Sequence, residues 1–239
     1  MDSINEMLFE NEKNWLKECN AEELATKYPI SRPFCYAVTE EYLKSDNRIM
    51  IVGQEAANYG RYMSKWPLDE IHQFNIDYTS TQLGYRKICD YNRSPFWKLF
   101  RKFIAIGIEP SWNNIDKFHQ VGEKEQTIPL TEEIERIVDT PYGDDHKSLL
   151  VREIEITKPV IILFVIGPYY HKALSYSFDT DDKMIQTFRP SRNSYCNELP
   201  SSLTKIDIPV YWTYHPAYLN RIHLIESVTN TIYNRIKEK

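Results

Sequence analysis

Three apolar runs punctuate the chain, and each leads into a polar or glycine-containing loop: residues 48–53, 160–166 and 206–212. Runs that are apolar on both faces are typical of central strands in a parallel sheet covered by helices. A fourth segment, residues 111–118, is more polar but is also expected to form a strand. Because helical patterns separate these strands, we predict an α/β protein, a three-layer α/β/α sandwich with a central four-stranded parallel sheet.

Amphipathic helices are predicted wherever apolar residues recur every three or four positions. The helix expected at residues 94–106 also carries a start signal, because Ser94 is a good N-cap and Pro95 suits the first helical position. The other clear patterns span residues 3–28, 144–157 and 219–239, and shorter ones span residues 36–44, 169–176 and part of 123–140.

Two segments lack a clear periodicity and are predicted to be irregular. Residues 61–92 are aromatic and polar, and their position after a strand end favours a lid over a site. Residues 178–202 are polar and are predicted to form a surface excursion. This second segment brings basic charge, from Arg189 and Arg192, to an otherwise acidic chain.

The length of 239 residues fits one domain, which we expect to span residues 1–239 with an N-terminal helical extension of about residues 1–47. A chain of this size can bury enough surface to fold without a disulfide or a metal. The four cysteines are widely scattered and form no C-x-x-C pair. We therefore expect buried thiols, no metal and no cofactor. The cysteines are Cys19, Cys35, Cys89 and Cys196.

Charge and hydropathy indicate where in the cell the protein is expected and which partners it can have. Residues 1–12 are acidic and polar and lack the features of a secretory signal. The longest apolar run, residues 160–166, is far shorter than a membrane span, so we expect a cytoplasmic monomer with no membrane partner. The net charge of −5 argues against a protein that only tracks phosphates, although a local basic patch can still meet nucleic acid. The 17 tyrosines suit recognition of flat ligands with polar edges.

The strand ends should bring four residues to one edge of the sheet: Glu55, Asn114, Gly167 and His215. Open α/β sheets bind ligands at the carboxyl edge of their parallel strands. Pro216 forces the residue before it into an extended conformation, so His215 is expected to be held at this edge. From the residues alone, His215 can also be a structural strand cap, and Glu55 a solvated loop residue.

Two motifs on this edge resemble those of the uracil-DNA glycosylase superfamily. Gly53-Gln54-Glu55 is similar to the Gly-Gln-Asp motif that follows the family's first strand. Residues 214–221, Tyr-His-Pro-Ala-Tyr-Leu-Asn-Arg, resemble the His-Pro-x-x-Leu-x-Arg motif of the branch that carries an iron–sulfur cluster. Residues 159–167 match the glycine-ended strand between the motifs. The resemblance covers residue 48 to the C-terminus and implies a uracil-DNA glycosylase-like fold.

The resemblance implies a base-flipping enzyme of base excision repair, which hydrolyses the N-glycosidic bond of uracil or another altered base in single- or double-stranded DNA. Glu55 would orient or deprotonate a water and offset the positive charge of the sugar. His215 would donate a hydrogen bond to the base O2 as negative charge develops there. Asn114 would read the base edge with an amide that is both donor and acceptor, and Asn113 is the competing choice.

The resemblance also suggests which residues hold the base and the DNA. We expect base contacts from Gln54, Asn114, Tyr59, Phe74 and Phe96, the three aromatic residues being candidates for stacking. We expect DNA contacts from Tyr218, Leu219, Arg221, Arg189 and Arg192. An apolar side chain such as Leu219 could fill the gap left by a flipped base. Each aromatic candidate can also be a core residue, and Leu219 can belong to the first turn of the last helix.

The chain departs from the family pattern in three places. Ala57 stands where the best-known branch has a tyrosine that excludes the thymine methyl, a task left to Tyr59. Glu55 replaces an aspartate, and the cysteines lack the spacing of the iron–sulfur branch. Two other functions stay open: a non-catalytic binding protein for a nucleobase, nucleotide or protein partner, and a hydrolase or transferase that acts on nucleosides.

Overall fold

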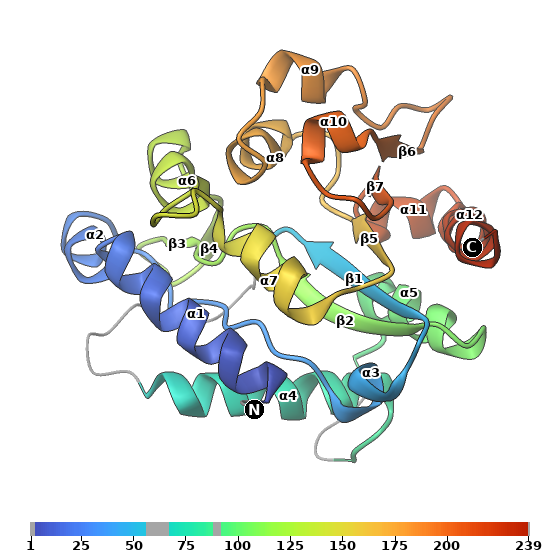
Figure 1. Ribbon diagram of the computed structural model, residues 1–239, viewed down its shortest axis with the longest axis horizontal. Helices are drawn as coiled ribbons and strands as arrows, with labels where there is room; N and C mark the ends of the chain where they lie inside the picture. The colour runs from blue at the N-terminus through green and yellow to red at the C-terminus, as the bar shows by residue number, and fades with distance from the viewer. Residues whose placement is uncertain (1–2, 56–66, 88–91, 239) are drawn as a thin grey trace.

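The computed structural model describes residues 3–55, 67–87 and 92–238. A mixed five-stranded sheet lies at its centre, with helices on both faces (Figure 1). The strand order is β2-β1-β5-β7-β6, in which β6 alone runs antiparallel to its neighbour. The strands span Glu109–Asn114 (β2), Arg48–Gly53 (β1), Ile161–Phe164 (β5), Val210–Thr213 (β7) and Cys196–Leu199 (β6), and a separate pair joins β3 (Gln120–Val121) to β4 (Thr127–Ile128).

The predicted α/β class is confirmed, but the sheet is mixed and has one strand more than predicted. β6 lies within residues 178–202, where sequence analysis expected only an irregular surface excursion. Of its residues only Leu199 is buried, because β6 is an edge strand that pairs with β7 alone. An edge strand of this kind has no apolar run from which it could have been predicted.

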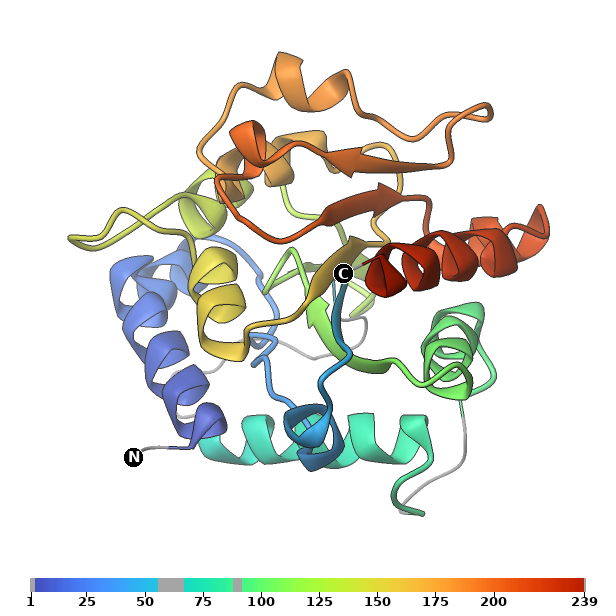
Figure 2. The same ribbon diagram turned by 45° about the vertical axis from the view of Figure 1, so that its right-hand side comes forward.

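The two faces of the sheet follow from the alternation of side chains along each strand. Met50 and Val52 pack with α1 (Ile4–Glu18) and α7 (Leu149–Thr157) in one core cluster. Ile49 and Ile51 pack with α5 (Pro95–Ala105) and α12 (Ile225–Lys237) in another. Figure 2 shows the sheet between these two helical layers. Burial on both faces explains why β5 is apolar throughout and why β1 is apolar after Arg48.

The predicted long helices at both ends of the chain are each divided in two. Asn20 and His223 adopt left-handed backbone conformations, with φ of 48° and 60°, which interrupt the helical hydrogen bonds. Ser94 caps α5 and Pro95 begins it, as predicted. The other helices are α2 (Ala21–Lys27), α3 (Glu40–Lys44), α6 (Glu132–Asp139), α8 (His171–Ser177), α9 (Asp182–Gln186), α10 (Ser201–Thr204) and α11 (Pro216–Arg221).

The prediction that residues 61–92 are irregular is wrong over most of the described part, because α4 (Leu68–Leu83) is a regular helix. Its buried side chains are largely polar, and they include His72, Asn75 and Gln82. Asn75 donates a 2.6 Å hydrogen bond to the carbonyl oxygen of Cys35. Since polar groups replace the usual apolar stripe, the sequence shows no helical periodicity here. Residues 56–66 of the expected lid lie outside the described residues.

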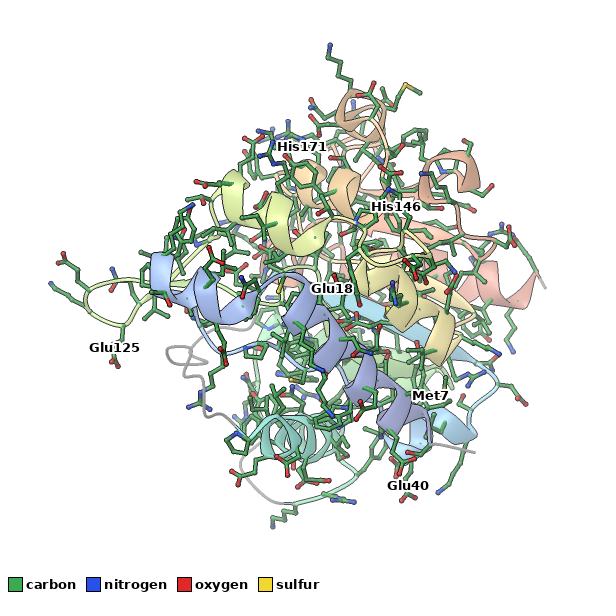
Figure 3. All side chains as sticks on the ribbon, turned by 60° about the vertical axis from the view of Figure 1, so that its left-hand side comes forward. Met7, Glu18, Glu40, Glu125, His146 and His171 are labelled. Atoms are coloured by element: carbon green, nitrogen blue, oxygen red, sulfur yellow. The ribbon has the colours of Figure 1, made fainter. Side chains whose placement is uncertain are left out.

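The N-terminal segment takes part in the main core. Leu8 of α1 is buried in the same cluster as Phe34 and Tyr36, which precede the first strand. Figure 3 shows α1 lying along the surface, with Met7 near its start and Glu18 at its end. Glu125 lies at the tip of the projecting turn between β3 and β4. Among the described helices, none combines the length and the apolar character needed to cross a membrane.

Candidate functional site

The carboxyl ends of β1 and β2 bring Gly53 and Asn114 directly opposite each other. A Cβ atom on Gly53 would lie 2.7 Å from Oδ1 of Asn114 and 3.2 Å from the Phe96 ring. No side chain fits at Gly53 without moving these two groups. The glycine of the first motif therefore lets an amide and an aromatic ring approach the end of β1.

Asn114 presents a donor that has no partner among the described residues. Its Oδ1 accepts a 3.1 Å hydrogen bond from Nε1 of Trp112, which fixes the orientation of the amide. Its Nδ2 is buried without a hydrogen bond in the described part of the chain. A buried polar atom of this kind is costly unless a ligand or water satisfies it.

Asn113, the competing choice, belongs to a different network. Its Nδ2 donates a 2.8 Å hydrogen bond to Oε2 of Glu153, and its Oδ1 accepts one from Nζ of Lys117. Successive residues of a strand point to opposite faces, so Asn113 faces away from Asn114. Asn113 is thus a structural residue, and Asn114 is the better candidate for reading a base.

His215 lies at the N-terminus of α11, directly after β7. Its Nδ1 accepts a 3.2 Å hydrogen bond from the backbone N–H of Ala217. In the neutral imidazole this assigns the hydrogen to Nε2, which remains a donor. Burial lowers the pKa of His215 below its ordinary value, which favours the neutral ring at pH 7. The ring is nearly parallel to Phe96, with centroids 6.5 Å apart and planes inclined by 23°.

Gln54 and Glu55 connect β1 to the loop after β5. Nε2 of Gln54 donates a 2.8 Å hydrogen bond to the carbonyl oxygen of Ile166. Oε2 of Glu55 accepts a 2.6 Å hydrogen bond from the hydroxyl of Tyr170, a residue that sequence analysis did not select. Tyr170 stands three positions after Gly167 at the same sheet edge, and this position is the only signal by which the sequence could have pointed to it.

A buried carboxyl group, that of Asp116, lies close to Gln54 and Glu55. The backbone N–H of Asp116 donates a 3.0 Å hydrogen bond to the carbonyl oxygen of Gln54. Both carboxyl oxygens of Asp116 are buried and unpartnered among the described residues. Burial first, and then the charges of Asp139, Glu135 and Glu55, hold the pKa of Asp116 well above its ordinary range. Asp116 is therefore protonated well above the pH at which an exposed aspartate ionises.

A cavity of about 680 Å³ opens along this edge, on the side of β5 and β7. Gln54, Gly167 and His215 line it from the strand ends. Its other walls include three tyrosines and two arginines: Tyr169, Tyr214, Tyr218, Arg189 and Arg192. Glu55, Asn114 and Phe96 are not among its lining residues, so the described site has two parts that meet at Gln54 and His215.

Four predicted residues remain: Phe74, Leu219, Arg221 and Tyr59. Phe74 is not brought to the site, since it is 55% exposed on α4 and its ring stacks on Tyr78. Leu219 has an exposure of 0% and packs in the core with α5 and α12, so its side chain does not project as a wedge. Arg221 lies over the ring of Tyr218, 5.0 Å from its centroid. The prediction for Tyr59 lies outside the described residues.

The comparisons with known proteins add no relative. The chain matches no protein-family model, and no curated protein matches its sequence. The functional argument therefore rests on the site itself and on the motifs that compose it.

Proposed function

We propose that this protein is a DNA glycosylase that hydrolyses the N-glycosidic bond of uracil or a related altered base. One observation carries the proposal: neutral His215, with Nε2–H as a donor, lies beside Phe96 at the sheet edge where Asn114 also holds an amide donor that has no partner among the described residues. These are an electrophile for the leaving base, an aromatic ring for its face and a donor for its edge. A flipped pyrimidine needs all three.

The chemistry places negative charge on the base as the bond between its N1 and the sugar breaks. Nε2–H of His215 donates a hydrogen bond to O2 of the base, where this charge collects. A neutral imidazole serves this purpose because it stabilises the anion without first having to lose or gain a proton. Nδ2 of Asn114 donates to a second carbonyl of the base, since its Oδ1 is already bonded to Trp112.

Glu55 acts on the sugar side. The departing base leaves an oxocarbenium-like carbon, which the carboxylate of Glu55 stabilises through its negative charge. Glu55 also accepts a proton from the water that attacks this carbon. Glu55 then returns this proton to solvent and the base anion takes one up, so the products are an abasic sugar and the neutral free base. The hydroxyl of Tyr170 holds one oxygen of Glu55 and leaves the other for the water.

Strand cleavage at abasic sites tests the proposal. Labelled oligonucleotides with one uracil, or one of several other altered bases, are incubated with the protein as single strands and as duplexes and then treated with alkali. We expect cleavage at the altered base. Glu55→Gln should lower the single-turnover rate about 10²–10⁴-fold, and His215→Asn about 10²–10³-fold.

A matched control separates the site from general damage to the fold. His223→Asn changes an exposed histidine whose left-handed backbone asparagine tolerates, and it should leave the rate unchanged. Absence of cleavage for every base, with a protein shown to be folded by circular dichroism, would contradict the proposal.

A second candidate function, a non-catalytic binding protein, is favoured by one observation. Glu55 accepts a hydrogen bond from Tyr170 and is not among the residues that line the cavity, whereas His215 and Gln54 are. A binding protein would retain affinity for DNA or a nucleobase without turnover. In that case Glu55→Gln would leave ligand affinity within about two-fold of the unmodified protein, and no abasic product would form.

A further inference from the structure

We propose that the cavity beside His215 is a groove for single-stranded DNA, in which tyrosines stack on unpaired bases and arginines bind the phosphates between them. The inference rests on the proposed function in assigning DNA as the ligand, and it adds the strand form and the residues that select it. The groove is defined here by Tyr169, Tyr214, Tyr218, Arg189 and Arg192.

The tyrosines of this groove are placed for stacking. Tyr169 is 78% exposed, although large aromatic side chains on a protein surface are usually covered. The rings of Tyr214 and Tyr218 pack against each other, with centroids 4.6 Å apart and planes inclined by 40°, so a base would stack on the outside of this pair. Base–aromatic stacking tolerates any base, because every base offers a flat face. Three such rings around one cavity make a platform for several consecutive bases.

The arginines are available for phosphates. Arg189 and Arg192 are exposed, and in the part of the chain that the structure describes neither forms an ion pair. The guanidinium of Arg189 lies over Tyr169, 4.9 Å from the ring centroid. Both arginines lower the pKa of Tyr214, which burial and Tyr218 raise, so their positive charge acts on this tyrosine of the groove. The positive charge therefore lies next to the stacking rings.

Three features favour a single strand over a duplex. The stacking rings would meet only the edges of paired bases, whereas unpaired bases expose their faces. Leu219, the residue expected to replace a flipped base in a duplex, is buried in the core. The chain carries a net charge of −5, and a duplex, with phosphates of both strands, needs a wider basic surface than two arginines provide.

Fluorescence anisotropy with unmodified DNA tests this groove without any need for catalysis. The probes are a labelled 12-nucleotide thymidine strand, its duplex with deoxyadenosine, a strand of abasic residues and the matching uridine RNA. We expect the thymidine strand to bind about ten-fold more tightly than each of the other three. Tyr169→Ala should weaken its binding about ten-fold, while Tyr169→Phe keeps the ring and the affinity.

The arginines are tested through salt. Replacing Arg189 and Arg192 together with glutamine should reduce the slope of log affinity against log salt concentration by about 1.4 for the single strand. Arg136→Gln, which removes an exposed arginine from α6, should leave the slope unchanged.

Equal or tighter binding of the duplex, the abasic strand or the RNA would overturn the proposal, as would full affinity in Tyr169→Ala. A protein that binds the thymidine strand through Tyr169 but releases no base would retain this groove and refute the glycosylase. A protein that releases uracil yet prefers duplex DNA would support the glycosylase and overturn the groove for single-stranded DNA.

Discussion

Two buried carboxyl clusters flank the end of β2, and only one of them pairs its acid with a cation among the described residues. In the first, Glu153 of α7 meets Nζ of Lys117 at 2.8 Å and also accepts from Asn113. In the second, Asp116 meets no cation among the described residues, and the carboxyl groups of Asp139, Glu135 and Glu55 act on it. Both clusters include residues of the short segment 113–117. Asn113 and Lys117 belong to the paired cluster, and Asp116 belongs to the unpaired one.

The comparison separates the cost of burial from the benefit of pairing. Burial raises the pKa of Glu153, but the charge of Lys117 and a hydrogen bond from Asn113 act against it. Burial also raises the pKa of Asp116, and every neighbouring charge raises it further. The first cluster is thus held together as an ion pair, whereas the second persists by remaining protonated. Only the second lies next to Gln54 and Glu55 of the candidate site.

The largest effect is expected from removing the cation of the paired cluster. Lys117→Met leaves Glu153 buried without its partner and should lower the free energy of unfolding by about 3–5 kcal/mol. The double variant Lys117→Met with Glu153→Leu should recover part of this loss, because Glu153 is no longer left unpaired, while Glu12 stays buried in the same cluster without the charge of Lys117. Urea unfolding at pH 7 measures both.

An exposed ion pair provides the control for that experiment. Lys147 meets Glu155 at 2.7 Å on the surface of α7, and Lys147→Met should cost less than about 1 kcal/mol. A similar loss in the Lys117 and Lys147 variants would mean that burial does not distinguish the two pairs.

The contribution of the unpaired cluster to stability should depend on pH, so its mutation is tested over a range of pH. A carboxyl group whose pKa is raised in the folded state binds a proton that the unfolded chain releases. Its contribution to stability therefore falls as the pH rises from the unfolded pKa to the folded pKa. Asp116→Asn removes this bound proton, so stability should fall less between pH 5 and pH 8 in the variant than in the unmodified protein.

Thermal unfolding across this pH range measures the difference. Each kcal/mol corresponds to about 2–4 °C in Tm for a chain of this size. Asp179→Asn, at an exposed aspartate paired with Lys205, should leave the pH dependence of Tm as it is. A parallel curve for Asp116→Asn would show that Asp116 is ionised in the folded protein.

The parts of the fold that could be predicted depend on local chemistry. β1 and the start of α5 follow from an apolar run and from a serine–proline cap, and both were predicted with their observed starting residues. α4 and β6 were missed because their stability comes from neighbours. The polar side chains of α4 are buried under other segments, and β6 needs the edge of β7. Periodicity cannot report such partners.

The candidate site also has parts that the sequence predicts and parts that it does not. The position of His215 at a strand end follows from the His-Pro pair. The end of β2 at Asn114 does not, because the strand was predicted over residues 111–118. The buried position of Leu219 and the contact between Tyr170 and Glu55 do not follow from the sequence either, because each depends on how distant segments pack. Tyr170 and Glu55 are 115 residues apart, and no local pattern links them.

The smallest expected change in stability comes from this last contact, and it connects the unpaired cluster to function. Tyr170→Phe removes the hydroxyl that holds Glu55 and should change the free energy of unfolding by less than about 1 kcal/mol. If Glu55 orients water, the variant should lower kcat about ten-fold with little change in KM, because the lost contact serves the transition state. Tyr176→Phe is the matched control, since it removes a 3.2 Å hydrogen bond to Glu132 from the same helix, on the exposed side. Equal kcat values in the two variants would assign Tyr170 to the fold alone, and a selective loss would make it a positioning residue for Glu55.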